Sequence, residues 1–388
     1  MKLKQANVAG MITHQKDGYV GGYGTETYKE KAEHAREIGL YFVKIDLTEE
    51  NARQIREGGN VTAKHWDGRT LSDVTIPARN IKAIYDFSEL DMPEYKDPAY
   101  DGIISALTNN GVRFVNGPKA KQIGNDKQLS QELFEEVGVR TPITMQYNRE
   151  NAKALLHESG FIFIKDIEGV MGNGQVTILS TGNGFMANVD GTKTGFRDVG
   201  SALDFAEESV QGRLIVQEGI VIPRLDGRVW DFRAIFQKDG SGNTVMPLVL
   251  VRIGAIGRDQ SNIDKGGEGQ DPYIFYPNFS TARCEIEEIG MKVFKGLERK
   301  AGDVGEIGMD FLASTKGELI LIEINPTPGY TAGYIRDLSN GGPVNFELTL
   351  QRGGNMPTEE EIHRNWAVSM RDRIRNPVSY SKHIVESE

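Results

Sequence analysis

The sequence predicts a mixed α/β (α+β) fold in which a small parallel sheet near the N terminus is followed by antiparallel hairpins. Up to about residue 115, short apolar runs alternate with helical patterns, which is typical of βα units. From residue 158 onward, the apolar runs follow one another through turn signals, as expected of hairpins. The chain has 388 residues, which is enough for two or three domains at roughly 100–200 residues per domain.

The N-terminal part is expected to contain alternating strands and helices around one sheet. The strands are predicted at 7–13, 41–46, 81–86 and 113–116, and the helices at 27–38 and 101–109. Gly21, Gly22 and Gly24 resemble part of a dinucleotide-binding fingerprint, but its third spaced glycine and the acidic residue about 20 positions later are missing. A flexible surface loop is therefore the favoured interpretation of this stretch.

The rest of the chain is expected to form two connecting helices and then two hairpin regions. Pro118 fits the first turn of a helix, and a second helix is predicted at 126–137, with Asn125 or Asp126 as its N-cap and Gly138 after its end. Further strands are predicted at 161–165, 175–179, 213–220, 231–236, 244–254, 306–313 and 318–324, and helices at 201–208 and 282–301. Residues 343–376 are expected to form a loop and a helix, and 377–388 a frayed polar tail. The predicted domains are an N-terminal domain at 1–117, a small subdomain at 118–215 and a large subdomain at 216–388.

Composition and charge exclude several classes of protein. With 45 Lys and Arg against 55 Asp and Glu, the net charge of −10 gives no excess of cations for nucleic acid or an anionic membrane. Cys284 is the one cysteine, so it cannot form an internal disulfide and is expected to be structural or incidental. The N terminus lacks the apolar segment of a signal peptide, and the apolar stretch at 245–257 is shorter than the ~20 residues that cross a bilayer. We expect a soluble, cytoplasmic protein without nucleic-acid or membrane partners.

A candidate metal site lies on the hairpin formed by the last two predicted strands, 306–313 and 318–324. If Lys316 and Gly317 form a two-residue turn, Asp310 and Glu323 face each other and Asn325 lies two residues further on the same face. Like charges opposite one another destabilise a sheet unless a positive charge lies between them. Two carboxylates and an amide oxygen suit Mg²⁺, with phosphate and water oxygens completing its octahedron. The alternative, acids on an exposed sheet face by chance, does not explain why an apolar strand ends abruptly in Glu-Ile-Asn-Pro.

A candidate phosphate site follows the strand at 161–165. Lys165 ends that strand, and the loop after it carries Gly169, Gly172 and Gly174, whose backbone N–H groups can form an anion-binding nest. A mobile glycine-rich hairpin is the alternative. The GxxxxGK[ST] pattern is absent from the sequence, which excludes the P-loop mechanism.

Two arginines form a second candidate anion site. Arg233 begins one strand and Arg252 ends the next, so that, if they lie across from each other, an anion such as a phosphate or carboxylate is needed between them. Surface ion pairs explain the same spacing equally well. A polar loop with Ser261, Asn262, Gly266 and Gly267 follows.

The order of these motifs resembles that of the ATP-grasp superfamily over about residues 110–330. The Asp231-x-Arg233, Asn262…Gly266-Gly267 and Glu323-x-Asn325 elements are similar to those of RimK-like ligases. The N-terminal segments 10–13, 65–68 and 83–86 look more like the YheC/YheD branch, first noted as spore-coat-associated proteins. Asp166 departs from the family pattern, in which proline commonly follows the second lysine.

The resemblance implies an ATP-grasp fold with an N-terminal parallel-sheet domain, a small flap subdomain and a C-terminal antiparallel subdomain. It also implies ATP and Mg²⁺ as cofactors, with two metal ions and with Mn²⁺ as a substitute. For ATP, it implies that the two binding lysines are Lys127 and Lys165, that the flap over the phosphates contains Gly169, Gly172 and Gly174, and that the hinge whose backbone reads adenine is formed by Gln217, Glu218, Gly219 and Ile220. Asp231 is then expected to contact the ribose or a nearby arginine, Arg233 and Arg252 to bind the γ-phosphate and the acyl phosphate, and Asn262 to lie near the phosphates. The implied Mg²⁺ ligands are Asp310, Glu323 and Asn325.

The implied reaction joins a carboxylate to an amine through an acyl phosphate, with an amino acid or peptide as substrate. It needs charge neutralisation but no protein nucleophile. Two alternatives stay open at this point: a nucleotide-binding, coat-associated protein without turnover, and a small-molecule kinase of the same fold. The pairing of two copies into a homodimer also stays open.

Overall fold

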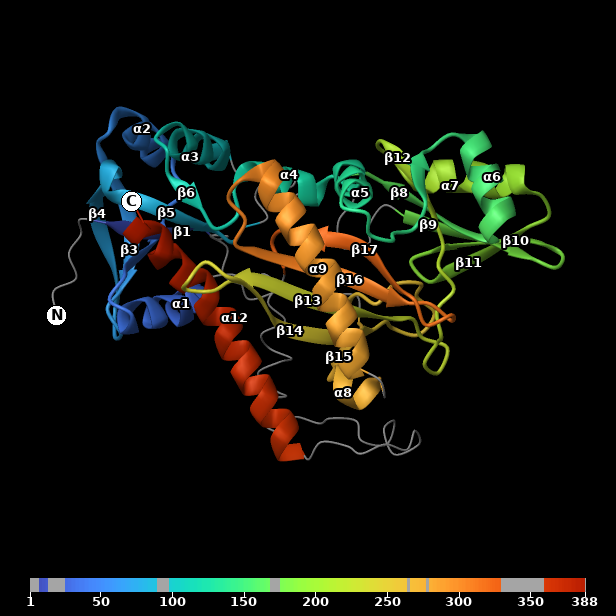
Figure 1. Cartoon of the computed structure of the whole chain (residues 1–388). Helices are drawn as coiled ribbons and strands as arrows, with labels where there is room; N and C mark the ends of the chain where they lie inside the picture. The colour runs from blue at the N-terminus through green and yellow to red at the C-terminus, as the bar shows by residue number, and fades with distance from the viewer. Residues whose placement is uncertain are drawn as a thin grey trace.

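The computed structural model describes residues 7–12, 25–88, 98–167, 175–263, 266–276, 279–328 and 359–387. The strands of these residues form three sheets, two with six strands and one with five. Figure 1 shows the sheet of the N-terminal part at one end of the molecule, the five-stranded sheet in the middle and the other six-stranded sheet at the far end. The mixed α/β fold that the sequence predicts is confirmed.

The first sheet is parallel in its middle and antiparallel at one edge. Its strand order is β4-β3-β2-β1-β5-β6, with parallel pairing from β2 to β6. The strands are β1 (Val8–Ile12), β2 (Tyr41–Ile45), β3 (Asn60–Trp66), β4 (Leu71–Pro77), β5 (Ile81–Asp86) and β6 (Arg113–Phe114). The parallel sheet that the sequence predicts is present in β2, β1, β5 and β6, and β3 and β4 add an antiparallel hairpin that the sequence analysis does not include. That hairpin is half exposed and carries few apolar residues, so its hydrophobic pattern is weak.

Helices cover both faces of the first sheet. The helices α2 (Glu49–Glu57) and α3 (Pro98–Asn109) pack on one face, and a short 3₁₀ turn, η1 (Ala78–Asn80), precedes β5. The other face holds α1 (Thr25–Glu37) and the end of the long helix α12 (Glu359–Ser387), which Figure 1 shows crossing from the middle of the molecule to this sheet. The predicted frayed tail at 377–388 is therefore wrong: Val378 and Ile384 are buried in the core.

Two short helices connect the first sheet to the rest. They are α4 (Pro118–Asn125) and α5 (Lys127–Glu136). Pro118 begins α4, as the sequence predicts. Of the two predicted cap residues, Asn125 and Asp126, it is Asp126 whose side chain caps α5 by accepting from the N–H groups of Gln128 and Leu129. This cap places Lys127 in the first turn of α5.

The second sheet is antiparallel, with the order β11-β10-β9-β8-β12-β7. Its strands are β7 (Thr144–Gln146), β8 (Phe161–Asp166), β9 (Gln175–Thr181), β10 (Gly184–Val189), β11 (Thr192–Phe196) and β12 (Leu214–Glu218). Its core includes residues of α6 (Arg149–Ser159) and α7 (Val199–Ser209). A domain division at 215–216 cuts β12, so we propose a boundary after Glu218 that keeps this sheet whole.

The third sheet carries most of the candidate site. Its order is β15-β14-β13-β16-β17, all antiparallel. Its elements are β13 (Trp230–Lys238), β14 (Thr244–Ile253), β15 (Glu268–Gln270), β16 (Glu306–Ala313), β17 (Leu319–Asn325), the short α8 (Pro272–Phe275) and α9 (Phe279–Ala301). The helix α9 packs on this sheet through residues such as Ile286 and Phe294. None of the described helices is both long and apolar enough to cross a bilayer.

Candidate functional site

The β16–β17 hairpin brings Asp310 and Glu323 opposite each other, as the sequence predicts, although the turn differs from the expected one. The loop between the strands covers 314–318 rather than two residues, and next to it Ala313 pairs with Leu319. An irregularity beside Asp310 inserts Ile322 as an extra residue in β17. This bulge corrects the register by one residue, so Asp310 meets Glu323.

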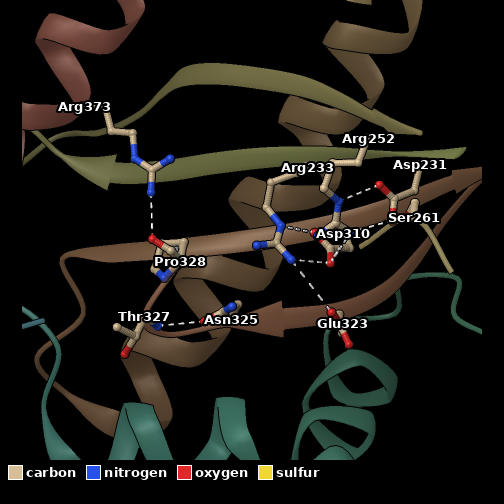
Figure 2. Close-up of polar contacts among 10 residues, drawn as sticks. All are labelled: Asp231, Arg233, Arg252, Ser261, Asp310, Glu323, Asn325, Thr327, Pro328 and Arg373. Carbon is tan, nitrogen blue, oxygen red and sulfur yellow. Dashed lines mark hydrogen bonds and ion pairs between the residues drawn. The ribbon is translucent and has the colours of Figure 1, made fainter. Parts of the chain in front are cut away.

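Asp310 is the centre of a buried ion network (Figure 2). Only 1% of its side chain is exposed. Arg233 donates to both of its carboxylate oxygens, the Nη2–Oδ2 distance being 2.7 Å, and Arg252 Nη2 donates to Oδ2 at 2.7 Å. Burial acts to raise the pKa of Asp310, but the two guanidinium groups outweigh it and hold that pKa below its usual range. The carboxylate is therefore charged.

Asp231 extends the network to the neighbouring strand. It lies opposite Arg252 in the β13–β14 pair and accepts from Arg252 Nε at 2.8 Å and from the Ser261 hydroxyl. Burial raises the pKa of Asp231, and Arg252 opposes this shift. The family resemblance implies that Asp231 contacts either the ribose of ATP or a nearby arginine, and the contact with an arginine, Arg252, is present.

The expected arrangement of the two arginines needs a correction. Arg233 lies opposite Leu250 and Arg252 opposite Asp231, so the arginines are not directly across from each other. The negative charge between them is Asp310 of the protein itself. An alternation of buried acids and arginines satisfies each charge without a bound anion.

Glu323 is the exposed member of the set. Its side chain is 53% exposed, and Arg233 Nη2 lies 3.9 Å from its Oε1. Desolvation and the neighbouring negative charge of Asp310 raise the pKa of Glu323 to about 6. Half of this side chain meets solvent, so the negative charge of Asp310 disfavours the ionised form of Glu323 more than burial does. Figure 2 shows the Glu323 carboxylate beyond Arg233, joined to its guanidinium by a dashed line.

The donor set fits Mg²⁺ in its chemistry. Asp310, Glu323 and Asn325 supply carboxylate and amide oxygens, which this cation prefers. Asn325 Oδ1 accepts from the Thr327 N–H at 2.9 Å, which orients its oxygen. Among the described residues, there is no cluster of three or more His, Cys, Asp or Glu side chains that could hold a metal ion. A cation held by two carboxylates and one amide would therefore need further oxygens from a ligand and water.

Lys165 approaches the network from the second sheet. Its Nζ donates to Gln217 Oε1 at 2.7 Å and lies 4.6 Å from the centre of the Phe163 ring. Burial lowers the pKa of Lys165 to about 8, while the negative charge of Glu323 opposes and the positive charge of Lys127 adds to this shift. The lysine on β8 and the acid on β17 are thus close enough to interact across the two sheets.

Lys127 lies beside the end of β8. Its Nζ donates to the carbonyl of Ile167 at 3.2 Å. Because Lys127 also lowers the pKa of Lys165, the two lysines form one local region of positive charge. The family resemblance implies that both are ATP lysines, and the structure brings their charges together.

The hinge segment Gln217, Glu218, Gly219 and Ile220 lies at the end of β12. The N–H of Glu218 donates to Ile143 O and that of Gly219 to Phe161 O, both at 2.8 Å. These two N–H groups are therefore engaged within the protein. The side chain of Gln217, which holds Lys165, is a contact that strand patterning alone does not reveal.

Asn262 lies in the loop after β14, beside Ser261 of the network, and its carbonyl accepts from the Gly267 N–H at 3.2 Å. The predicted flap residues Gly169, Gly172 and Gly174 lie outside the described residues.

A contact from α12 to the segment after β17 is not evident from the sequence. Arg373, of which 2% of the side chain is exposed, donates to the carbonyl of Pro328 at 2.7 Å (Figure 2). Pro328 follows Asn325 by three residues, so this arginine fixes the segment that leaves the site. A helical pattern with one arginine among several carries no signal for such a contact.

Comparison with protein families identifies similar sequences. A family model described as YheC/D like ATP-grasp matches residues 125–338. The endospore coat-associated protein YheD of Bacillus subtilis (strain 168) is 22% identical over 178 residues, which are 43% of this chain and 39% of that protein. The chain thus matches less than half the length of this relative.

Solved structures with the same fold are distant in sequence. D-alanyl-alanine synthetase A from Vibrio cholerae O1 biovar eltor strain N16961 has a TM-score of 0.51 at 15% identity and covers 94% of this chain and 99% of its own. A Chryseobacterium gregarium RiPP-associated ATP-grasp ligase, in complex with ADP and a leader and core peptide, has a TM-score of 0.51 at 12% identity, covering 90% and 98%. At these identities the likeness concerns the fold alone.

Proposed function

Because the chain belongs to the YheC/D-like ATP-grasp family, we propose that it is an ATP- and Mg²⁺-dependent ligase that joins a carboxylate to an amine. One observation carries the proposal: an exposed acid, Glu323, stands at the edge of the buried network of Asp310, Arg233 and Arg252, within electrostatic reach of Lys165. Paired acids and cations at one point suit the handling of a metal-bound polyphosphate.

We assign the residues as follows. Lys127 and Lys165 bind phosphate oxygens, and the carbonyls of the hinge segment and the N–H of Ile220 contact the adenine. Asp310, Glu323 and Asn325 hold Mg²⁺, which when bound screens the charge of the nucleotide phosphates. Arg233 and Arg252 neutralise the charge that develops on the transferred phosphoryl group, and Asp231 orients Arg252. Asn262 and the glycines at 169, 172 and 174 complete the phosphate contacts.

The chemistry needs no protein nucleophile. A substrate carboxylate oxygen attacks the γ-phosphorus of ATP, the bond to the β-phosphate oxygen breaks, and an acyl phosphate and ADP form. The nitrogen of the amine then attacks the acyl carbon, phosphate leaves and the amine loses a proton. The protein contributes orientation and fixed positive charge to both steps.

An amino acid or a peptide is the proposed substrate class. This choice is supported by two proteins of the same fold. One is a D-alanyl-alanine synthetase, and the other is a ligase in complex with a leader and core peptide. We propose a cytoplasmic enzyme whose partners are small carboxylate and amine substrates. Sedimentation analysis tests the pairing of two copies into a homodimer.

Product analysis tests the reaction. Incubation with ATP, Mg²⁺ and mixed amino acids or short peptides should give ADP, phosphate and a new amide, measured by mass spectrometry. AMP and pyrophosphate would refute the acyl-phosphate route. ADP together with a phosphorylated small molecule, and no amide, would identify a kinase.

A nucleotide-binding coat protein without turnover is the second candidate, because the curated relative is an endospore coat-associated protein. Glu323→Gln distinguishes the two. For a ligase, turnover should fall at least about 100-fold while ADP binding without metal is retained, since the hinge and lysines are untouched. Glu318→Gln, on the same hairpin but paired with Arg140 at the surface, is the matched control and should leave turnover unchanged.

A further inference from the structure

Asp259 joins the second sheet to the loop that follows β14. Its Oδ2 accepts from Thr177 Oγ1 on β9 at 3.0 Å and from Asn188 Nδ2 on β10. Its Oδ1 accepts from Arg224 Nη2 at 3.2 Å, and 16% of the Asp259 side chain is exposed. Three donors from three segments thus converge on one carboxylate, and hydrogen bonds to a charged group are about twice as strong as neutral ones.

The partners of Asp259 on the second sheet are themselves ordered. Thr177 and Asn188 are buried. Asn188 Oδ1 also accepts from the Gly191 N–H at 3.0 Å, so one side chain both shapes the β10–β11 turn and binds Asp259. Beside it, Arg258 Nη1 lies 2.8 Å from Asp190 Oδ1 of the same turn, but this pair is more exposed and stabilises little. Asp259 is therefore the principal contact.

The loop that carries Asp259 is compact and closed at its base. The Gly254 N–H donates to Val229 O at 2.9 Å, and the Gly267 N–H to Asn262 O at 3.2 Å. A Cβ at Gly254 would lie 2.1 Å from the carbonyl oxygen of Gln260, so the backbone folds back on itself. A loop packed this closely moves as a unit, and a displacement of Asp259 displaces its neighbours.

Those neighbours belong to the buried network. Ser261, two residues after Asp259, donates to Asp231, and Asp231 binds Arg252. Figure 2 shows Ser261 and Asp231 beside Arg252, near the start of β13 and the end of β14. A continuous path therefore runs from β9 and β10 through Asp259 to the arginine that we assign to the phosphoryl group.

We propose that Asp259 is a positioning residue that couples the approach of the second sheet to the placement of Arg252 and Asn262. This inference rests on the proposed function of the site. When the two sheets lie together, the carboxylate receives its three donors; when they separate, water replaces them at little net cost, so the contact is reversible. A nucleotide held between the lysines of one sheet and the acids of the other favours the joined state.

Nucleotide affinity and hydrogen exchange test the role together. Asp259→Ala should raise the ADP dissociation constant about 10-fold, within the range of conformational coupling. In the absence of nucleotide it should also raise amide exchange in residues 175–189 and 254–263. Thr177→Val should weaken ADP binding less, whereas Thr177→Ser, which keeps the hydroxyl, should retain wild-type affinity. The double variant Thr177→Val and Asp259→Ala should bind ADP no more weakly than the single variant Asp259→Ala, because both substitutions remove the same hydrogen bond.

Asp204→Asn on α7, which removes an exposed ion pair with Arg149 of α6, is the control for general disturbance of the second sheet and should leave both readouts unchanged. Wild-type ADP affinity in Asp259→Ala overturns the positioning role. An equal loss in Thr177→Ser and Thr177→Val also overturns it, since the hydroxyl would then be irrelevant. Failure of the wild-type chain to bind ADP refutes the proposed function. Unchanged amide exchange in Asp259→Ala without nucleotide refutes the positioning role on its own, so the two failures are distinguishable.

Discussion

Four charged side chains, Asp231, Arg252, Asp310 and Arg233, alternate in sign within a nearly buried row. Each acid has an arginine on at least one side, so every charge is hydrogen-bonded despite its removal from water. Deleting one member would leave its neighbours charged and unpaired, which is far more damaging than deleting the whole set. The row therefore behaves as a unit, and Glu323 and Lys165 are the members of the site that titrate near neutral pH.

Lys165 gives the site a specific pH dependence. Its protonated form attracts phosphate, and burial lowers its pKa to about 8 in the free protein. ADP affinity should therefore be constant below pH 8 and fall above it, approaching tenfold per pH unit, because proton uptake then accompanies binding. Isothermal titration of ADP between pH 6.5 and 9.5 measures this.

Lys165→Arg is the matched control, since arginine keeps its charge throughout this range. Its ADP affinity should be flat where the wild-type affinity falls. The same alkaline decrease in the variant would assign the titration to another group, and the proposed contact of Lys165 with phosphate would be withdrawn.

The end of β12 depends on a glycine for its close approach to β8. A Cβ at Gly219 would lie 2.0 Å from Cδ1 of Phe161, and the Gly219 N–H donates to Phe161 O at 2.8 Å. Gly219→Ala should lower the free energy of unfolding by about 1–3 kcal/mol through overpacking. It should also weaken ADP binding, because the segment assigned to the adenine is displaced.

Phe161→Ala removes the obstacle and provides the check. In that background, Gly219→Ala should cost less free energy of unfolding and less ADP affinity than in the wild-type chain, as measured by urea denaturation and titration. Equal costs in the two backgrounds would mean that the ring is not what the alanine meets.

The helix α12, the last described element, connects the first sheet at one end of the molecule to the third sheet in its middle. Arg373 binds Pro328 O after the site, its own carbonyl accepts from Gln237 of β13, and the carbonyl of Ile374 accepts from Lys31 of α1 at 3.4 Å. Glu306 of β16 accepts from Tyr85 of the first sheet at 2.6 Å. These buried contacts hold the first sheet against the strands that carry the candidate metal ligands.

Lys31 at this junction makes stability depend on pH. Its side chain is fully buried, with Nζ 4.6 Å from the centre of the Tyr85 ring, and burial lowers its pKa to about 7, against the opposing charge of Glu306. Between pH 7 and the usual lysine pKa, the unfolded chain binds this proton and the folded chain does not. The contribution of Lys31 to stability therefore rises as the pH rises through this window.

Lys31→Met keeps the shape of the side chain and removes the titration. The variant should be more stable than the wild-type chain by a few kcal/mol at pH 6.5, at about 1.4 kcal/mol per unit of pKa shift, and this advantage should shrink by pH 9.5. Urea denaturation at the two pH values measures it. A pH-independent difference would show that the lysine is charged in the folded state.

The strands and helices with strong apolar periodicity could be predicted from sequence, as could the facing acids of β16 and β17. The cap of α5 could be narrowed to Asn125 or Asp126. The pairing of Asp310 with Glu323 was predicted from a two-residue turn that does not exist, and the bulge at Ile322 compensates for the longer loop. A bulge places two residues of one strand opposite one residue of the next, so it depends on how the two strands pair, and the local sequence does not encode it.

By itself, the sequence determined which residue types are available: oxygen donors at the end of an apolar strand, lysines beside a glycine-rich turn, and arginines on two consecutive strands. Only the tertiary structure decided that Asp310 neutralises both arginines, that Gln217 holds Lys165, and that α12 and Asp259 support the site from other parts of the fold. The physical reason is that spacing along one strand or helix follows from backbone geometry, whereas contacts between distant segments depend on how whole sheets pack. Charge balance in a buried site is a property of that packing, since each ion needs a partner that another element supplies.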